Sequence, residues 1–346
     1  MKKQAQLRSL LLGLTVFLFG VFAVHAYSQA TNRKSRQPVL FVVNQRDHTT
    51  DIIDPVTGQI LAAIPTGGEK WHGHEVATSP DGRTAYVPIY GNSGVGKPGT
   101  DGNSMVVIDL TSRKIVGNVD FGHGVRPHCP VFDAKRGVLY VTTEIDRTIS
   151  IIDPHALKVV GSVPTGQAES HMFVLSHDGR RGYTANVGPG TVSVLDMRDR
   201  KVLTIIPISH TTQRISISPD DSMVFTSDQT KPQLAVLNTH SNTVRAWVSL
   251  PDLGYGTAST LDGRWLLVAM PRANQVAVVD LHSLKVARTI AVCGAPQEVL
   301  VQPNNPTVAY VSCMSGNEVA VLDLSNWKMQ RTLNAGRGAD GLAWAN

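Results

Sequence analysis

Three histidines occupy the same position in successive copies of a repeated sequence. His74, His128 and His171 each stand six residues before a turn of the chain. Neutral imidazoles from neighbouring strands are common protein ligands for zinc and copper. The pattern therefore predicts a divalent metal site, with Zn or Cu as the ion. The alternative is that histidine only closes backbone hydrogen bonds where each strand begins.

The same register supplies four further side chains that can form hydrogen bonds, and two aromatic residues precede His74 closely in the sequence. Polar groups that converge from several strands are typical of a small-molecule site. The predicted ligand-binding residues are Trp71, His72, Gln213, Tyr255, Gln297 and Asp340.

A second set of residues could carry acid–base chemistry. Arg126 and His128 flank a proline, and Glu144 follows in the next segment. A cation can stabilise a developing oxyanion and a carboxyl group can move a proton, and hydrolysis of an ester or lactone needs both. Arg126, His128 and Glu144 are therefore candidate catalytic residues. The alternative is that Glu144 is a solvated loop charge.

These residues belong to a sevenfold repeat. Short apolar runs that end in Asp or Asn recur with their last residues 55, 44, 43, 42, 42 and 43 positions apart. A period of about 40 to 45 residues with four strands per unit is typical of a β-propeller. Alternating apolar and polar residues around Ser79-Pro-Asp-Gly82 predict antiparallel strands joined by tight turns. The sequence thus predicts an all-β, seven-bladed β-propeller with four antiparallel strands per blade.

The two ends of the chain predict how the ring closes. Val39–Asn44 begins a blade without its innermost strand, and residues 340–346 form an innermost strand with nothing after it. We expect the C-terminal strand to complete the N-terminal blade, which removes an exposed sheet edge. Antiparallel strands also place the histidines and the long loop Tyr90–Ser104 at one end of the ring, named the top face below.

The repeats resemble two known families. Pro80-Asp-Gly-Arg-Thr-Ala-Tyr-Val87 and Gly190-Thr-Val-Ser-Val-Leu-Asp196 resemble the YVTN-repeat seven-bladed β-propellers, over about residues 38–346. Arg126-Pro-His128 with Glu144-Ile-Asp146 resembles the seven-bladed lactonase family, which includes 6-phosphogluconolactonase-like and muconate-lactonising members. That resemblance implies that Arg126 and His128 hold a carboxylate or lactone oxygen and that Glu144 acts as acid or base. Pro127 departs from the family, in which Arg and His are adjacent.

The N-terminus is typical of an export signal. Basic residues precede an apolar run at residues 10–24, and small residues follow at Ala26 and Ala30. The pattern predicts a signal peptide at residues 1–30, a linker at 31–37 and the propeller at 38–346. We expect a periplasmic or secreted protein. The alternative is an uncleaved membrane anchor, although the apolar run is short for a span of about 20 residues.

The net charge of the chain indicates which classes of partner to expect. The first 36 residues carry six basic side chains and no acidic one, so the net charge of +5 for the whole chain becomes −1 for the remainder. We expect no nucleic-acid partner, because proteins that bind nucleic acid usually carry net positive charge. We also expect no stable membrane insertion after signal cleavage, and a monomer.

The chain has three cysteines, and an odd number leaves at least one unpaired. We expect Cys129, Cys293 and Cys313 to be buried as small apolar residues, with a Cys293–Cys313 bridge as the alternative.

The favoured functional interpretation is an exported propeller that holds a small ligand, a metal ion or a protein partner at the histidine-rich top face of its central channel. One alternative is a lactonase-like hydrolase or lactonising enzyme. Another is a non-catalytic scaffold for protein interactions. Whether the protein is an enzyme stays open at this point.

Overall fold

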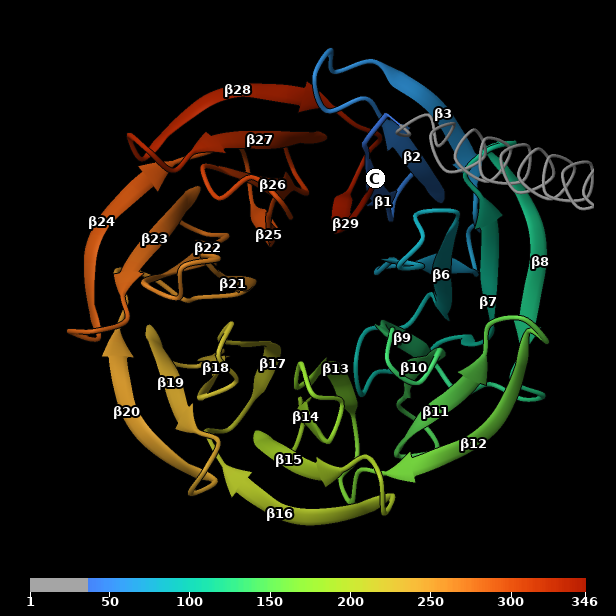
Figure 1. Cartoon of the computed structure of the whole chain (residues 1–346), viewed down its shortest axis with the longest axis horizontal. Coiled ribbons are helices and arrows are strands. Elements are labelled where there is room, and N and C mark those ends of the chain that lie inside the picture. Colours follow the sequence, from blue (N-terminus) through green and yellow to red (C-terminus); the bar gives the residue numbers. More distant parts are fainter. Residues whose placement is uncertain (1–36) are drawn as a thin grey trace, which may run out of the picture. The chain divides into compact units, whose positions relative to one another are not determined.

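Seven antiparallel sheets, six of four strands and one of five, are arranged in a ring around a central channel (Figure 1). The structure is a computed structural model that describes residues 37–346, in which Pro38–Ala345 forms one compact unit. The predicted all-β, seven-bladed propeller is confirmed, and the second blade differs from the others only in that its innermost strand is split in two. The predicted signal peptide and nearly all of the linker lie outside the described residues.

The strands of the first three blades are β1 (Val39–Asn44), β2 (Thr49–Ile53), β3 (Ile60–Pro65), β4 (His72–Gly73), β5 (Ala77–Thr78), β6 (Thr84–Gly91), β7 (Asp101–Asp109), β8 (Lys114–Asp120), β9 (Pro127–Asp133), β10 (Val138–Thr143), β11 (Thr148–Asp153) and β12 (Lys158–Pro164). The following strands are β13 (Ser170–Leu175), β14 (Arg181–Asn186), β15 (Thr191–Asp196), β16 (Lys201–Pro207), β17 (Thr212–Ile217), β18 (Met223–Asp228), β19 (Gln233–Asn238), β20 (Thr243–Ser249), β21 (Thr257–Ser259), β22 (Trp265–Met270), β23 (Gln275–Asp280), β24 (Lys285–Ala291), β25 (Pro296–Val301), β26 (Val308–Cys313), β27 (Glu318–Asp323), β28 (Lys328–Asn334) and β29 (Ala339–Ala345).

The C-terminal strand closes the ring as the sequence predicts. β29 pairs antiparallel with β1, with Leu40 opposite Trp344 and Val42 opposite Leu342, and the sheet order is β29-β1-β2-β3. Trp344 is buried, and its ring stacks on Tyr310 of the preceding blade at 5.7 Å between centroids. The first and last described strands therefore hold one blade together.

The acid that ends each apolar run caps the turn that follows it. Asp153 accepts backbone N–H bonds from His155 and Ala156 at 2.8 and 3.0 Å, and Asp280 does the same for the two residues at equivalent positions. A side chain that satisfies the turn in this way fixes a short reversal between the third and fourth strands. The repeated acid therefore has a structural role.

The hydrophobic core lies between adjacent blades rather than within any one of them. Tyr140 of one blade packs edge-on against Phe173 of the next, 6.0 Å between ring centroids, and both side chains are buried. In every blade the pairing of the third and fourth strands has one register shift, at equivalent places. The outermost strand of each blade is thus a bulged edge strand.

Two of the three cysteines form a disulfide, which corrects the expectation that all three are buried thiols. Cys293 and Cys313 are bonded, with Cα atoms 5.7 Å apart, and Cys129 is buried and free. Pro296 pairs with Cys313 across β25 and β26, so the hairpin brings the crossing that contains Cys293 onto the end of β26. The two cysteines are 20 residues apart in the sequence, so the sequence alone does not show that they lie close together. Within the described part of the chain, no helix has the length and apolar character to span a membrane.

Candidate functional site

The innermost strands have an extra residue where they enter the channel. Between Thr212 and Ile215 the register to β18 shifts, so two residues of β17 face one residue of its partner. The register of β9, β13 and β25 also shifts, at His128, His171 and Gln297. A bulge breaks the strand's alternation and changes where a side chain points. Repeated around the ring, these bulges place polar side chains in the channel.

A cavity of about 130 Å³, named the chamber below, lies where these side chains meet. Its walls come from the innermost strands with the segments next to them and from the ends of second strands, and the loop between β6 and β7 contributes Ser93, Gly94 and Val95. The other lining residues are Gln45, His74, Tyr90, His128, His171, Gln213, Arg214, Tyr255, Met314 and Asp340.

A buried carboxylate holds one histidine of the chamber in place. His171 Nδ1 lies 2.6 Å from Glu144 Oε1, and the hydroxyl of Tyr90 donates to Glu144 Oε2 at 2.7 Å. All three side chains are buried. Because Nδ1 donates to the carboxylate, Nε2 of the neutral imidazole carries the lone pair. The amide nitrogen of Gln213 lies 3.5 Å from Nε2, on the chamber side.

Two further imidazoles lie beside His171. The ring of His128 is 3.6 Å from that of His171 and 5.2 Å from that of His74, measured between centroids. Burial lowers the pKa of His128 well below its usual range. Burial also lowers the pKa of His171, although Glu144 opposes the change. His128 Nδ1 and His74 Nε2 are buried without a hydrogen-bond partner in the structure.

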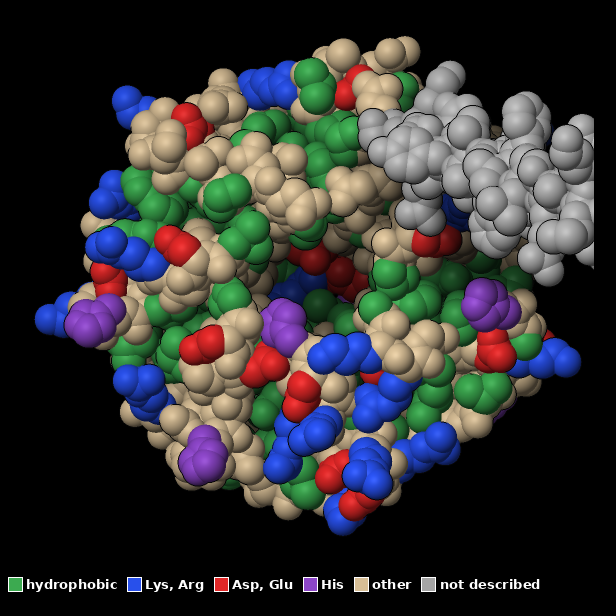
Figure 2. All heavy atoms as spheres, viewed as in Figure 1, with side chains coloured by type: hydrophobic (Ala, Val, Ile, Leu, Met, Phe, Trp, Pro, Cys, Tyr) green, Lys and Arg blue, Asp and Glu red, His purple; other side chains and the backbone are tan. Residues whose placement is uncertain are grey.

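Arg214 stands at the centre of a buried charge cluster deep in the channel. Its guanidinium binds Glu75 and lies 2.8 Å from Asp340 Oδ1, and it covers the ring of Tyr255 at 5.0 Å. Burial would raise the pKa of Asp340, but the charge of Arg214 and bonds from His74 and Gln45 leave it below the usual value. Figure 2 shows acidic and basic side chains at depth in the central hollow of the ring.

The pKa values of two other carboxyl groups in this cluster are raised instead of lowered. Burial raises the pKa of Glu75 well above its usual range despite Arg214, and it raises the pKa of Glu298 to about 7. The two side chains are hydrogen-bonded to each other, and Glu298 accepts the backbone N–H of Leu342 at 2.7 Å. Burial therefore favours the protonated form of these two groups, whereas Arg214 and its neighbours favour the ionised form of Asp340, which faces the chamber.

Arg126 has a different place from the one that the lactonase resemblance implies. Its side chain does not line the chamber but binds Asp101 Oδ1 through Nε at 2.5 Å and the carbonyl of Lys97 through Nη2 at 2.8 Å. Arg126 therefore fixes the loop between β6 and β7 over the chamber. Of the three candidate catalytic residues, His128 lines the chamber and Glu144 contacts it through His171 and Tyr90.

Three predicted ligand-binding residues lie away from the chamber. Trp71 is 41% exposed and does not line it. His72 stacks between His48 and His74, with centroids 5.7 and 5.3 Å away, and burial lowers its pKa to about 4. The amide of Gln297 donates to the carbonyl of Ala295 at 3.1 Å. The remaining three, Gln213, Tyr255 and Asp340, all line the chamber.

The three predicted metal ligands come together, but not in a metal-binding arrangement. Among residues 37–346, no group of three or more His, Cys, Asp or Glu side chains is placed to hold an ion. His128 and His171 overlap closely instead of pointing to one centre, and Nδ1 of His74 and His171 is bonded to Gln45 and Glu144. The binding of Zn or Cu at His74, His128 and His171 stays a prediction.

Several residues of the site are absent from the sequence-based prediction. Glu75, Arg214 and Glu298 each follow a predicted residue directly, and strict alternation would send them to the opposite face of the blade. The bulges bring them into the channel. Tyr90 is a fourth such residue, and the only signal for it in the sequence is its position at the end of an apolar run, where the long loop begins.

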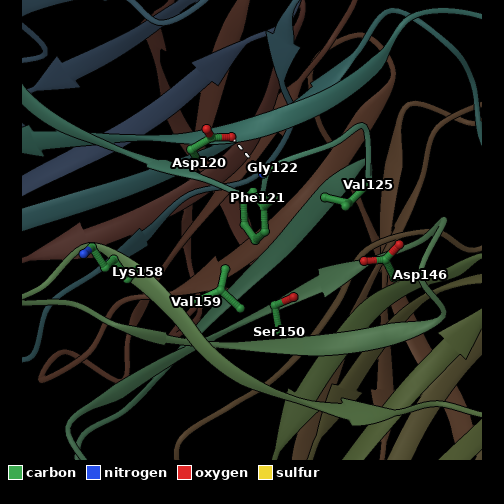
Figure 3. A pocket seen from close by; sticks show the side chains of 8 residues that line it. All are labelled: Asp120, Phe121, Gly122, Val125, Asp146, Ser150, Lys158 and Val159. Atoms are coloured by element: carbon green, nitrogen blue, oxygen red, sulfur yellow. Dashed lines mark hydrogen bonds between the residues drawn. The ribbon is translucent and has the colours of Figure 1, made fainter.

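A larger cavity of about 330 Å³ lies on the outer part of the ring, between β8 and β12. Figure 3 shows Phe121 and Val159 pointing toward each other across it, with Asp120 and Lys158 at one end and Asp146 at the other. Asp120 accepts the N–H of Gly122 at 2.8 Å, and Asp146 binds His123 at 2.8 Å. Its charged groups are exposed, and both of its carboxylates have partners close in the chain or in the next loop, so the chamber is the better candidate site.

Comparisons with known proteins place the chain among propellers. A family model described as "Lactonase, 7-bladed beta-propeller" matches residues 55–303. Hydrazine synthase of Kuenenia stuttgartiensis has a similar structure, with a TM-score of 0.67, 16% identity, and coverage of 80% of this chain and 90% of that one. A functionally unknown protein of Desulfotomaculum acetoxidans has a TM-score of 0.72, 15% identity, and coverage of 89% and 99%. At such identities the likeness concerns the fold alone. No curated protein sequence matches the chain significantly.

Proposed function

The chain belongs to the seven-bladed β-propeller lactonase family, and from that premise we propose that its chamber binds a lactone and hydrolyses it with His171 as general base. The observation that carries the proposal is the buried contact of His171 with Glu144, 2.6 Å from Nδ1 to Oε1. A carboxylate that fixes the tautomer of a histidine also stabilises the imidazolium that forms when Nε2 takes a proton.

The reaction balances with water as the only co-reactant. Nε2 of His171 takes a proton from water while the water oxygen bonds to the carbonyl carbon of the lactone. The ring C–O bond then breaks, and the leaving oxygen takes that proton from Nε2, which gives a hydroxy acid. Gln213 and His128 line the same cavity and can donate hydrogen bonds to the oxyanion that develops on the carbonyl oxygen.

The pH dependence follows from the pKa of His171. A general base must be unprotonated, and burial lowers the pKa of this imidazole although Glu144 opposes the change. We expect turnover to stay constant from pH 8 down past about 6.5, the usual histidine value, and to fall only at lower pH. A rate that already declines below pH 7.5 would argue against His171 as the base.

Substitution of the dyad tests the proposal. Glu144→Gln and His171→Gln should each lower kcat by about 10²- to 10⁴-fold, the usual contribution of a positioned acid or base. Asp146→Asn is the matched control, because it breaks a similar carboxylate–histidine contact, with His123 at 2.8 Å, on the exposed surface. If all three variants hydrolyse lactones at the wild-type rate, or if the wild type hydrolyses none, the proposal fails.

A further inference from the structure

The chamber restricts both the size and the charge of what it can hold. Its volume is about 130 Å³. A dry protein cavity of about 150 Å³ holds a benzene-sized molecule. A guest of about six to eight non-hydrogen atoms therefore fits, which is a single five- or six-membered ring with at most one small substituent.

The roof of the chamber is fixed by hydrogen bonds. The ends of the loop between β6 and β7 bond to each other, since Thr100 N donates to Asn92 Oδ1 at 2.8 Å and Asn92 N donates to the carbonyl of Thr100 at 3.2 Å. Arg126 ties the middle of the loop through Lys97 and its far end through Asp101. Enlarging the chamber would require these bonds to break, so the loop limits the size of the guest.

The chamber also lacks a free positive charge. Arg214 is the only lysine or arginine among its lining residues, and the carboxyl groups of Glu75 and Asp340 already occupy the guanidinium. His128 and His171 are buried, and a neutral imidazole brings no charge. A buried phosphate or carboxylate would face Asp340 without a counter-charge, and burying an unpaired ion is strongly unfavourable.

We infer that the chamber takes a small uncharged ring, such as an unsubstituted four- or five-carbon lactone, and excludes phosphorylated sugar lactones. The inference rests on the proposed function for the reaction but on the chamber alone for the ligand. It separates this chain from relatives that act on larger anionic lactones, because those ligands need room and cations that the chamber does not have.

The test measures binding and turnover separately. Saturation-transfer NMR reports binding, and proton release at constant pH reports hydrolysis. The compounds are γ-butyrolactone, its carboxylated derivative, gluconolactone and the phosphate ester of gluconolactone. We expect binding and hydrolysis of γ-butyrolactone, and at least 100-fold lower kcat/KM for the other three. The carboxylated small ring adds a charge together with three non-hydrogen atoms, and gluconolactone adds size without a charge.

Two variants show whether the signal comes from the chamber. Val95→Trp places a large ring in the roof and should abolish binding of γ-butyrolactone, whereas Val159→Trp fills the outer cavity and should leave it unchanged. Val95 is half-buried and Val159 is exposed, and thermal melting verifies the fold. Comparable turnover of the phosphate ester would overturn the inference while lactone hydrolysis stands. Binding of γ-butyrolactone without turnover of any lactone would support the inference while the proposed function fails. No binding of γ-butyrolactone, or binding unaffected by Val95→Trp, would also overturn it.

Discussion

Replacing Arg214 with methionine should destabilise the fold strongly at neutral pH. The guanidinium makes two contacts with buried carboxylates, of Glu75 and Asp340. Each charge-assisted bond contributes about 1.5 to 3 kcal/mol, and removing one partner of a buried pair costs about 3 to 5 kcal/mol. We take about 3 to 5 kcal/mol as the expected loss in the free energy of unfolding. At about 2 °C per kcal/mol for a chain of this size, Tm should fall by about 6 to 10 °C.

The loss should depend on pH in a defined direction. In the wild type the lowered pKa of Asp340 adds stability above the carboxyl's usual pKa, and that stability disappears as the pH falls through the folded value. In Arg214→Met the buried carboxylate is unpaired, so its pKa rises. Protonation on acidification then removes the cost of the buried charge. The difference between variant and wild type should therefore shrink from pH 7 toward about pH 4, near the usual pKa of Asp.

Urea unfolding at several pH values measures this difference. Arg337→Met is the matched control, because the Arg337–Asp47 pair, 2.6 Å apart, has an arginine that is 69% exposed. Exposed pairs contribute about 0 to 1 kcal/mol, so the control should unfold like the wild type. The reasoning is refuted if Arg214→Met lies within 1 kcal/mol of the wild type at pH 7, or if its deficit grows on acidification.

Three further predictions concern the ring, the disulfide and the metal. Deleting β29 exposes the inner edge of β1 and removes Trp344, and truncating a tryptophan in a core costs about 3 to 5 kcal/mol. The shortened protein should therefore aggregate or lose cooperative melting. A melting curve like that of the wild type would contradict the closure of the ring by β29. Replacing Cys293 and Cys313 with alanine opens a loop of 20 residues and should lower the free energy of unfolding by about 3 kcal/mol. Reduction of the wild type should give the same loss. An unchanged Tm would contradict this prediction. If the three channel histidines bind Zn or Cu, each His→Ala change should lower the metal content at least 10-fold, measured by mass spectrometry of the metal, and equal content in all variants would end that interpretation.

The architecture could be predicted from the sequence because it repeats. One blade specifies a strand order, and seven copies with a constant period leave little freedom in how the blades follow one another. The unpaired strand at each end of the chain then fixed the closure that β1 and β29 make. The register also brought His74, His128 and His171 to one cavity, because equivalent positions of a repeat lie at equivalent heights in the channel.

The charge cluster could not be predicted in the same way. Arg214 follows Gln213 directly, and the rule of alternation assigns neighbours to opposite faces of a strand. A bulge depends on backbone pairing with the next strand, and no residue type at this place predicts it. The position of Arg126 could not be predicted for another reason. An arginine beside a histidine suggests chemistry, but the partners that occupy it, Asp101 and Lys97, belong to a loop whose path the sequence does not reveal.

The bulged outermost strands affect how the protein behaves at high concentration. Each blade presents one edge to solvent, with a row of N–H and C=O groups that another molecule could extend into a fibre. The bulge interrupts that row in all seven blades. Five of these strands also begin with a lysine, whose charge repels a second copy, namely Lys114, Lys158, Lys201, Lys285 and Lys328. The shape and charge of these edges therefore oppose the edge-to-edge addition of a second copy.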